Sequence, residues 1–202
     1  MRRDAPPERP FQSLETAYFD ALYAKDADPW GFAASPYEAG KYARTIAALP
    51  KARYASGFEA GCSIGVLTAL VAERCEALLA VDVAEAALVQ ARARNRDCPH
   101  VRFARARLPK ECPDGPFDLI LLSEVLYYFD ERELAAVSKS VKRIAAPEAD
   151  VILVHWLGPT PDYPLTGDEA AEAFIRNMVP VAQVLRQERQ ELYRLDLLRL
   201  RP

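Results

Sequence analysis

Phe58-Glu59-Ala60-Gly61-Cys62-Ser63-Ile64-Gly65 is the stretch that decides the fold, together with Asp82 at the end of the next apolar run. The pattern is typical of a strand, a tight glycine turn and a helix start, followed by a second strand that ends in a carboxylate. A Cβ at Gly61 or Gly65 would obstruct a ligand that approaches the backbone. Free amides at the start of the helix would face that ligand, and Asp82 could hold a ribose. The stretch therefore predicts a nucleotide-cofactor site.

The kind of cofactor follows from the missing glycines. Ser63 and Val66 stand where the dinucleotide motif G-x-G-x-x-G has its second and third glycines, so a pyrophosphate has less room and NAD is disfavoured. S-adenosylmethionine has no phosphate, and its amino-acid end and ribose diol suit a glycine turn and an acid. The spacing of Glu59, Gly61 and Gly65 resembles motif I of class I methyltransferases. A tight turn without a ligand is the bland alternative.

A second interpretation uses the same residues. Gly61-Cys62-Ser63-Ile64-Gly65 matches G-x-S-x-G, the nucleophile elbow of α/β-hydrolases, and Asp118 or Asp130 followed by His155 gives the expected order of triad partners. The chain has only two histidines, however, and no upstream stretch that resembles the oxyanion-hole motif His-Gly-Gly-Gly. A hydrolase with a serine nucleophile, or a non-catalytic nucleotide-binding module, stays as the alternative.

Composition limits the other classes of function. The chain has 202 residues, half of them apolar, enough for one substantial core. A net charge of -3 provides no field that would gather nucleic acid. No run reaches the length of a membrane span, and the residues after Met1 include prolines and charges rather than an apolar signal segment. We expect a cytoplasmic protein with a small-molecule or oligosaccharide substrate and neither nucleic acid nor membrane as a partner.

The four cysteines give no sign of metal or disulfide chemistry. Cys62, Cys75, Cys98 and Cys112 form no C-x-x-C pair, and no histidine stands at zinc spacing. We therefore expect reduced thiols and no metal site.

Three regions follow one another along the chain. Residues 1–10 are proline-rich and charged, which predicts a disordered tail. Apolar residues at helical spacing from Phe11 to Leu22 predict a first helix. Ser35-Pro36-Tyr37-Glu38 combines an N-cap serine, a proline at N1 and a glutamate at N3, so a second helix should run to about Leu49. We expect residues 11–50 to form an N-terminal helical cap on a single methyltransferase-like domain of residues 51–202.

Beyond residue 50, strand-like and helix-like segments alternate. The expected strands are 54–60, 77–83, 101–104, 117–125 and 151–157, and the expected helices are 64–74, 84–96, 130–145 and 167–177. Two further strand-like runs, 181–187 and 191–200, are joined tightly enough for an antiparallel hairpin. The fold class predicted is α/β, a Rossmann-like, doubly wound, mostly parallel seven-stranded sheet with that hairpin at its end.

The parallel sheet brings distant residues together. Ligands in such sheets bind outside the carboxyl ends of the strands. This rule predicts one crevice lined by residues that are far apart in sequence: Gly61, Asp82, Ser123, Glu124, His155 and Trp156.

Several stretches within about residues 15–170 carry a family resemblance. The stretches are Asp28-Pro29-Trp30-Gly31-Phe32, Ser35-x-Tyr37-Glu38-x-x-Lys41-Tyr42, Glu59-Ala60-Gly61-Cys62-Ser63-Ile64-Gly65, Phe117-Asp118-Leu119-Ile120, Ser123-Glu124-Val125-x-Tyr127-Tyr128, His155-Trp156, and Asp162-Tyr163-Pro164-Leu165-Thr166-Gly167-Asp168-Glu169. Taken together, they resemble the nodulation protein S (NodS)-like family of S-adenosylmethionine-dependent methyltransferases.

The resemblance implies a role for each part of the crevice. The methionine part of S-adenosylmethionine would lie against Gly61 with its neighbours Glu59, Cys62 and Ser63, and the ribose against Asp82 and Val83. The strand end at Ser123 would form the edge of the transfer site.

The chain departs from the family pattern in two places. Arg107 stands where the family tends to have an acid that reaches the adenine amino group, and arginine cannot accept that hydrogen bond. Backbone groups near Arg107 and Leu108 should then hold the adenine. Residues 146–150, which lack the glycines common in the family, are expected to form a turn.

Methyl transfer from a sulfonium needs alignment and exclusion of water more than a metal. An amine acceptor must present a lone pair, and His155 is the first candidate for a base that removes its proton, although a buried histidine is the alternative. Glu124 ends an otherwise apolar strand, where an unpaired buried carboxylate is costly, which favours a role in binding a cationic acceptor or cofactor. Tyr127 and Tyr128 could orient a hydroxylated substrate, or serve only in packing. Trp30, Phe32 and Tyr37, from the cap, could close over the sulfonium by cation–π contact, or only hold the cap against the core.

The prediction is a methyltransferase with S-adenosylmethionine as its cofactor and S-adenosylhomocysteine as its product. The family's namesake methylates the free amine of a deacetylated chitooligosaccharide. N-methylation of an amino sugar is therefore the hypothesis for the acceptor, with N-transfer favoured over O-transfer.

Overall fold

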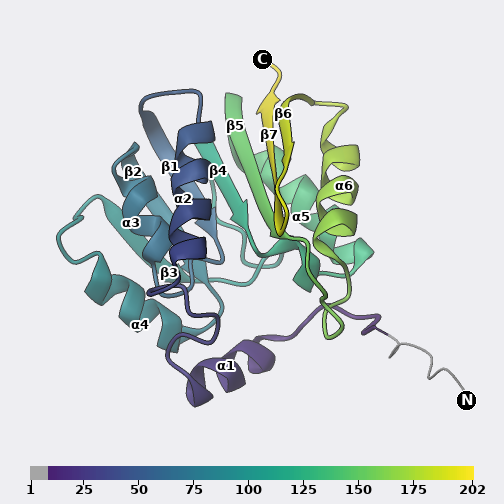
Figure 1. Ribbon diagram of the computed structural model, residues 1–202. Coiled ribbons are helices and arrows are strands. Elements are labelled where there is room, and N and C mark those ends of the chain that lie inside the picture. Colours follow the sequence, from purple (N-terminus) through teal and green to yellow (C-terminus); the bar gives the residue numbers. More distant parts are fainter. Residues whose placement is uncertain (1–8) are drawn as a thin grey trace, which may run out of the picture.

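Seven strands form one sheet in the order β3-β2-β1-β4-β5-β7-β6 (Figure 1). The computed structural model describes residues 9–202, so the predicted disordered tail falls almost entirely outside the described residues. The strands are β1 (Tyr54–Ala60), β2 (Cys75–Asp82), β3 (Val101–Arg105), β4 (Phe117–Ser123), β5 (Ala145–Trp156), β6 (Ala182–Arg189) and β7 (Tyr193–Leu200). β1 to β5 run parallel, and β7 is antiparallel to both β5 and β6. The predicted doubly wound sheet with a C-terminal hairpin is confirmed.

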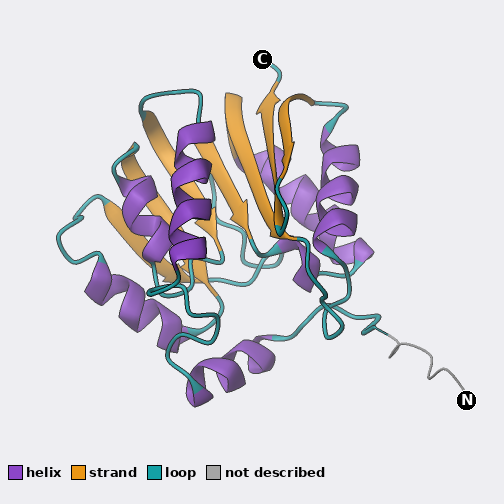
Figure 2. Cartoon of the chain, viewed as in Figure 1, coloured by secondary structure: helices purple, strands orange, loops and turns teal. Residues whose placement is uncertain are grey.

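Helices cover both faces of this sheet (Figure 2). They are α1 (Thr16–Lys25), α2 (Pro36–Ala48), α3 (Val66–Ala72), α4 (Glu85–Arg94), the 3-10 helix η1 (Leu126–Tyr128), α5 (Glu131–Ile144) and α6 (Gly167–Met178). α2 and α3 pack on one face, in an apolar cluster that includes Tyr42 and Val71. α5 and α6 pack on the other face, in a cluster that includes Val137 and Phe174. The strand order reverses between β1 and β4, which is where sheets of this kind hold ligands.

The central strands are apolar because both faces are covered. Leu119, Ile120, Leu121 and Leu122 of β4 are completely buried, as is Phe58 of β1. These strands therefore fix the start of the loop that follows each of them, at the carboxyl edge of the sheet.

Side-chain caps set the starts of three helices: Ser35 caps α2, Asp130 caps α5 and Thr166 caps α6. The Ser35 hydroxyl accepts a hydrogen bond from the Glu38 amide (3.3 Å), as the sequence predicts for α2. The Glu38 carboxylate does not return the bond to Ser35; it binds Lys41 instead (3.0 Å). A complete capping box occurs at α6, where Thr166 and Glu169 bind each other's backbone amides.

Two predicted boundaries are wrong. α1 begins at Thr16 rather than Phe11, because the Leu14 amide donates to the Tyr128 carbonyl (2.9 Å) and holds this segment against η1. Phe11 is 84 % exposed. Residues 146–149, expected as part of a turn, lie within β5 and form a bulge, since they stand between the Phe117–Ala145 and Leu119–Asp150 pairs.

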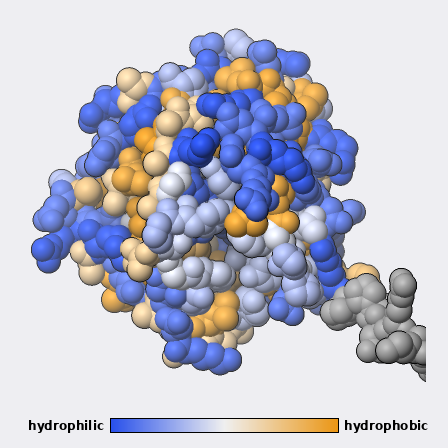
Figure 3. Space-filling view, viewed as in Figure 1, coloured by the Kyte–Doolittle hydropathy of each residue, from blue (hydrophilic) through white to orange (hydrophobic). Residues whose placement is uncertain are grey.

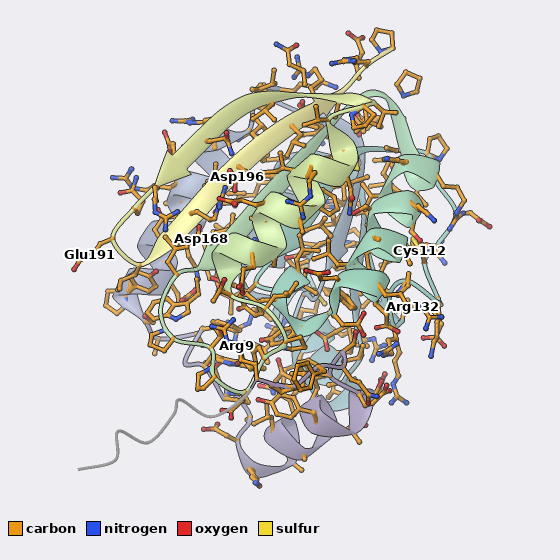
Figure 4. The ribbon with its side chains drawn as sticks, turned by 90° about the vertical axis from the view of Figure 1, so that its right-hand side faces the viewer. Arg9, Cys112, Arg132, Asp168, Glu191 and Asp196 are labelled. Carbon is orange, nitrogen blue, oxygen red and sulfur yellow. The ribbon has the colours of Figure 1, made fainter. Side chains whose placement is uncertain are left out.

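Ion pairs fasten the C-terminal hairpin to α6. The Arg194 guanidinium lies between Asp168 of α6 (2.8 Å) and Asp196 of β7 (2.8 Å), and it is 7 % exposed. Figure 4 shows the two aspartates on the neighbouring helix and strand. Arg189 binds Asp168 as well. Since breaking a buried pair leaves an uncompensated charge, these contacts fix the edge of the sheet in place.

The surface is mixed in character. Hydrophilic residues cover most of the face in Figure 3, and apolar residues occur there in separate groups. Within residues 9–202, no helix combines the length and the apolar character needed to cross a membrane. The division into a cap of residues 11–50 and a domain of residues 51–202 stays a prediction.

Candidate active site

A cleft of about 430 Å³ opens at the carboxyl edge of β1, β2 and β4. Its volume falls within the range usual for sites that hold small molecules and cofactors. Most of the predicted site residues line it: Trp30, Glu59, Gly61, Cys62, Ser63, Asp82, Val83, Arg107, Leu108, Ser123, Glu124 and Tyr128. Three do not: Tyr37, Gly65 and His155. The topology therefore brings together side chains from five separate parts of the sequence.

The two glycines of the turn serve different purposes. Gly61 has φ +72°, and a Cβ added there would meet nothing closer than Val125, at 3.4 Å. Gly61 lines the cleft, and the missing side chain leaves room there. A Cβ on Gly65, which has φ +75°, would lie 2.9 Å from Ala91 Cα and 2.6 Å from the Asn95 amide. The prediction that Gly65 makes room for a ligand is wrong, because this glycine lets α3 and α4 approach each other.

Asp82 shapes the glycine turn. Its Oδ2 accepts from the Ser63 amide (2.9 Å) and its Oδ1 from the Ala84 amide (2.9 Å). The carboxylate lines the cleft while Asp82 is only 9 % exposed, and burial raises its pKa. A carboxylate has about four acceptor positions, so Asp82 keeps capacity for further hydroxyl donors from the cleft.

Glu59 is a buried acid without a complete set of partners. It ends β1 beside the turn, is 2 % exposed, and has an Oε2 atom with no hydrogen-bond partner among the described residues. Burial raises the pKa of Glu59 to about 7, and Asp82 acts in the same direction. An unpaired buried carboxylate is costly, so the position favours a cationic or hydrogen-bond-donating ligand.

Glu124 does lie in the cleft, but its oxygens are occupied. Oε1 accepts from Lys41 (2.6 Å), and Oε2 accepts from the Tyr127 hydroxyl (2.7 Å) and the Trp156 amide (2.8 Å). Burial alone would raise the pKa of Glu124, but Lys41 and His155 lower it, and the net shift is downward. The residue is therefore a fixed carboxylate, held in a left-handed backbone conformation (φ +54°).

Lys41 and Glu38 belong to the site, although the sequence analysis gave neither of them a role there. Lys41 bridges Glu38 and Glu124, and its side chain is 2 % exposed. The spacing of Glu38 and Lys41 is also that of an ordinary surface ion pair on a helix. The family stretch that contains both residues was the signal available in the sequence, but only the packing of α2 shows that the pair is buried.

His155 is placed behind the wall of the cleft. It is completely buried, and its Nε2 accepts from the Leu126 amide (3.2 Å). Burial lowers the pKa of His155 to about 4, and its Nδ1 has no partner in the described structure. Its ring lies against Tyr127, behind the wall of the cleft, and its low pKa makes it a weak proton acceptor, so the position does not fit the predicted role of base.

Aromatic rings line the side of the cleft near η1. The Tyr127 and Tyr163 rings stack (centroids 5.2 Å apart), and Tyr128 meets Tyr163 edge-on at 4.8 Å. Burial raises the pKa of Tyr128 well above its ordinary value, so its hydroxyl stays protonated. These rings form a dry wall that offers hydroxyl groups to a bound molecule.

Three rings from the N-terminal segment, Trp30, Phe32 and Tyr37, divide into two groups. Trp30 lies in the cleft and stacks on Phe32 (5.5 Å). Tyr37 packs instead against Trp156 and Tyr193, outside the cleft. Trp30 and Phe32 therefore line the cleft and Tyr37 does not.

Hydrogen bonds fix Arg107 at the β3 side of the cleft. Its guanidinium binds both oxygens of Glu133 (3.2 and 3.1 Å), and its amide donates to Glu111 (2.7 Å). The Arg107 amide, one of the backbone groups expected to hold adenine, already has an acceptor.

The hydrolase interpretation fails on geometry. The Ser63 hydroxyl bonds to the Tyr23 hydroxyl (2.5 Å), and His155 is buried elsewhere. The other histidine, His100, bonds to the Ala72 carbonyl, and neither histidine lines the cleft. Without a base beside it, Ser63 cannot be activated as a nucleophile. No group of potential metal ligands occurs within residues 9–202.

The glycine turn, the acids that end β1 and β2, and the sheet order define a protein of the class I methyltransferase fold. The model of the family described as Nodulation protein S (NodS) matches residues 20–155, about two thirds of the sequence. The chain belongs to this family.

Relatives and solved structures agree with this membership. Nodulation protein S of Bradyrhizobium diazoefficiens is 32% identical over 127 residues, 62% of this chain and 61% of that protein. Nodulation protein S of Rhizobium tropici is 28% identical, over 62% of this chain and 53% of the relative. The chain thus matches between half and two thirds of the length of these relatives.

Two solved structures share the fold. A Pseudomonas syringae protein assigned to the methyltransferases is 35% identical, with a TM-score of 0.71 over 81% of this chain and 98% of that one. The N-methyltransferase NodS of Bradyrhizobium japonicum, in complex with S-adenosylhomocysteine, is 21% identical, with a TM-score of 0.78 over 92% of this chain and 97% of that one.

Proposed function

We propose that this protein is a methyltransferase that uses S-adenosylmethionine. The single observation that carries the proposal is the pair of buried acids, Glu59 and Asp82, on either side of an open glycine turn in one cleft. Family membership and the S-adenosylhomocysteine bound to the B. japonicum relative support the same conclusion.

The residues present fit this cofactor. Space beside Gly61 would take the methionine part, and the unpaired Oε2 of Glu59 would face its ammonium group. Asp82, with Val83 beside it, would accept from the ribose hydroxyls. The adenine ring would lie toward Leu108, at the β3 side of the cleft.

The chemistry assigned to the protein is alignment and exclusion of water. S-adenosylmethionine supplies a methyl group on a positively charged sulfur. Trp30, Tyr128 and Tyr163 would bound the space in which an acceptor approaches that methyl group in line. Their apolar faces would keep water out, and aromatic faces also stabilise cations. Glu124, fixed by Lys41, would add negative charge near the transfer site.

The acceptor we propose is an amine, with the amino group of a glucosamine-type sugar as the first candidate. The proposal rests on the family match and on the negative charge of the cleft, where Glu38, Glu124 and Asp162 outnumber Lys41. A protonated amine would be drawn to that charge. No base is assigned, so the amine would lose its proton to water.

A methyl-transfer assay tests both parts of the proposal. Radiolabelled S-adenosylmethionine is incubated with the protein and deacetylated chitooligosaccharides, and labelled sugar and S-adenosylhomocysteine are both measured. Labelled sugar is the expected result. Cofactor binding without label in these oligomers would reject the sugar alone. If a wide panel of amines also yields no S-adenosylhomocysteine, the protein is a binding module instead of an enzyme.

A further inference from the structure

We infer that Lys41 binds the α-carboxylate at the amino-acid end of the cofactor. This inference rests on the proposed function and adds a binding residue to it. Lys41 lies on α2, lines the cleft and keeps its ammonium group almost completely buried.

Charge singles out Lys41. Among the described residues that line the cleft, Lys41 and Arg107 are the cations, against Glu38, Glu59, Asp82, Glu124 and Asp162. Arg107 lies at the β3 side and is held by Glu133. A ligand carboxylate that enters beside the glycine turn therefore meets one positive charge, that of Lys41.

Position supports the same assignment. The Lys41 ammonium is 2.6 Å from Glu124 Oε1, and the next residue, Val125, lies where a Cβ on Gly61 would touch it. Gly61 and Glu59 come from β1, and Glu124 follows β4, the strand paired with β1. Lys41 thus contacts the residue that precedes Val125, and Val125 borders the space beside Gly61.

Hydrogen-bonding capacity remains on the ammonium group. A lysine has three donors, and the structure gives Lys41 two carboxylate partners, Glu38 and Glu124. The Tyr37 ring lies 5.5 Å from the ammonium on another side. One N–H group is left for a ligand. Glu59 for the ligand's ammonium and Lys41 for its carboxylate together match a zwitterionic amino acid.

A ligand-and-variant cycle tests the inference by calorimetry. The ligands are S-adenosylhomocysteine and its decarboxylated analogue, which keeps the amine and lacks the carboxylate. We expect the native protein to bind S-adenosylhomocysteine about 10- to 100-fold more tightly, the size of a charge-assisted hydrogen bond. In Lys41→Met this preference should disappear.

Lys51→Met is the matched control. Lys51 also lies 5.5 Å from a tyrosine ring, that of Tyr54, but outside the cleft, just before β1. It should keep the full preference. Because Lys41→Met leaves two carboxylates uncompensated, Lys41→Met/Glu124→Gln is measured in the same way if the single variant does not fold.

Each outcome decides the question. A preference that survives in the Lys41 variants, or equal binding of both ligands to the native protein, overturns the inference and leaves the proposed function intact. If neither ligand binds the native protein, the proposed function itself fails.

Discussion

We expect the carboxyl group of Glu59 to make cofactor binding depend on pH. Its pKa in the free protein is about 7, because the group is buried, so it is protonated below neutral pH. A bound ammonium group favours the carboxylate, so the ligand should bind more tightly once the proton has left. We predict that S-adenosylhomocysteine binds about tenfold more weakly at pH 6 than at pH 8, as measured by calorimetry.

The Glu59→Gln variant is the control for this prediction. It has no proton to lose, so its affinity should be lower overall and the same at both pH values. His155, with a pKa of about 4, does not titrate in this range. Native protein whose affinity is unchanged or falls from pH 6 to pH 8 would show that Glu59 does not face the ligand's cation.

At the scale of single elements, Gly65 controls how closely α3 approaches α4. A Cβ there would lie 2.9 Å from Ala91 Cα, and the backbone is left-handed. We predict that Gly65→Ala lowers the free energy of unfolding by about 2–4 kcal/mol, which combines backbone strain with overpacking. Urea denaturation measures the change.

Gly40 provides the matched comparison. It lies inside α2, and an added Cβ would have no atom within 4 Å. Gly40→Ala should therefore stabilise the protein by about 0.5–1 kcal/mol, because alanine favours a helix. Equal effects of the two substitutions would refute the packing role given to Gly65.

Sequence patterns predict elements well where local signals agree. β1 was expected at 54–60 and occurs there, and α2 has the predicted serine cap and starts at the predicted proline. The start of α1 was wrong, because a contact with η1, far away in sequence, overrides the helical spacing of apolar residues. The bulge in β5 was not predicted for the same kind of reason, since only pairing with β4 makes residues 146–149 part of a strand.

At the scale of the whole molecule, two buried groups, His155 and Glu59, change the stability of the fold in opposite directions as the pH falls. His155 has a native pKa of about 4 and an ordinary value of 6.5, so below pH 6.5 the unfolded chain binds a proton that the native state does not. Stability then falls toward acid. Glu59 is raised from 4.5 to about 7, so the native state binds the extra proton and stability rises toward acid.

The two effects should nearly cancel between pH 7 and pH 5, at about 2 kcal/mol each. Urea denaturation of the native protein should show a change of less than about 1 kcal/mol from these groups. Glu59→Gln should lose about 2 kcal/mol over the same range, and His155→Gln should gain about as much. Parallel curves for both variants would contradict the assignment.

Sequence patterns could predict the part of the site that the order and direction of the strands bring together. Asp82 ends β2 and Glu124 follows β4, on either side of β1, so the binding of ligands at the carboxyl ends of parallel strands places both in one cleft. Burial of individual side chains was not predictable. His155 and Trp156 end the same strand, yet only Trp156 lines the cleft, because alternate residues of a strand face opposite sides.

Calorimetric titration of S-adenosylhomocysteine, with the native protein and Asp82→Ala, tests the cofactor site most directly. We predict saturable binding at one site in the native protein and about 10- to 100-fold weaker binding in Asp82→Ala. Asp118→Ala is the matched control, because Asp118 also accepts two backbone amides (3.0 and 2.8 Å) but lies outside the cleft; it should bind as the native protein does. Absence of binding to the native protein, or equal affinity in all three proteins, would contradict the assignment of this cleft to the cofactor.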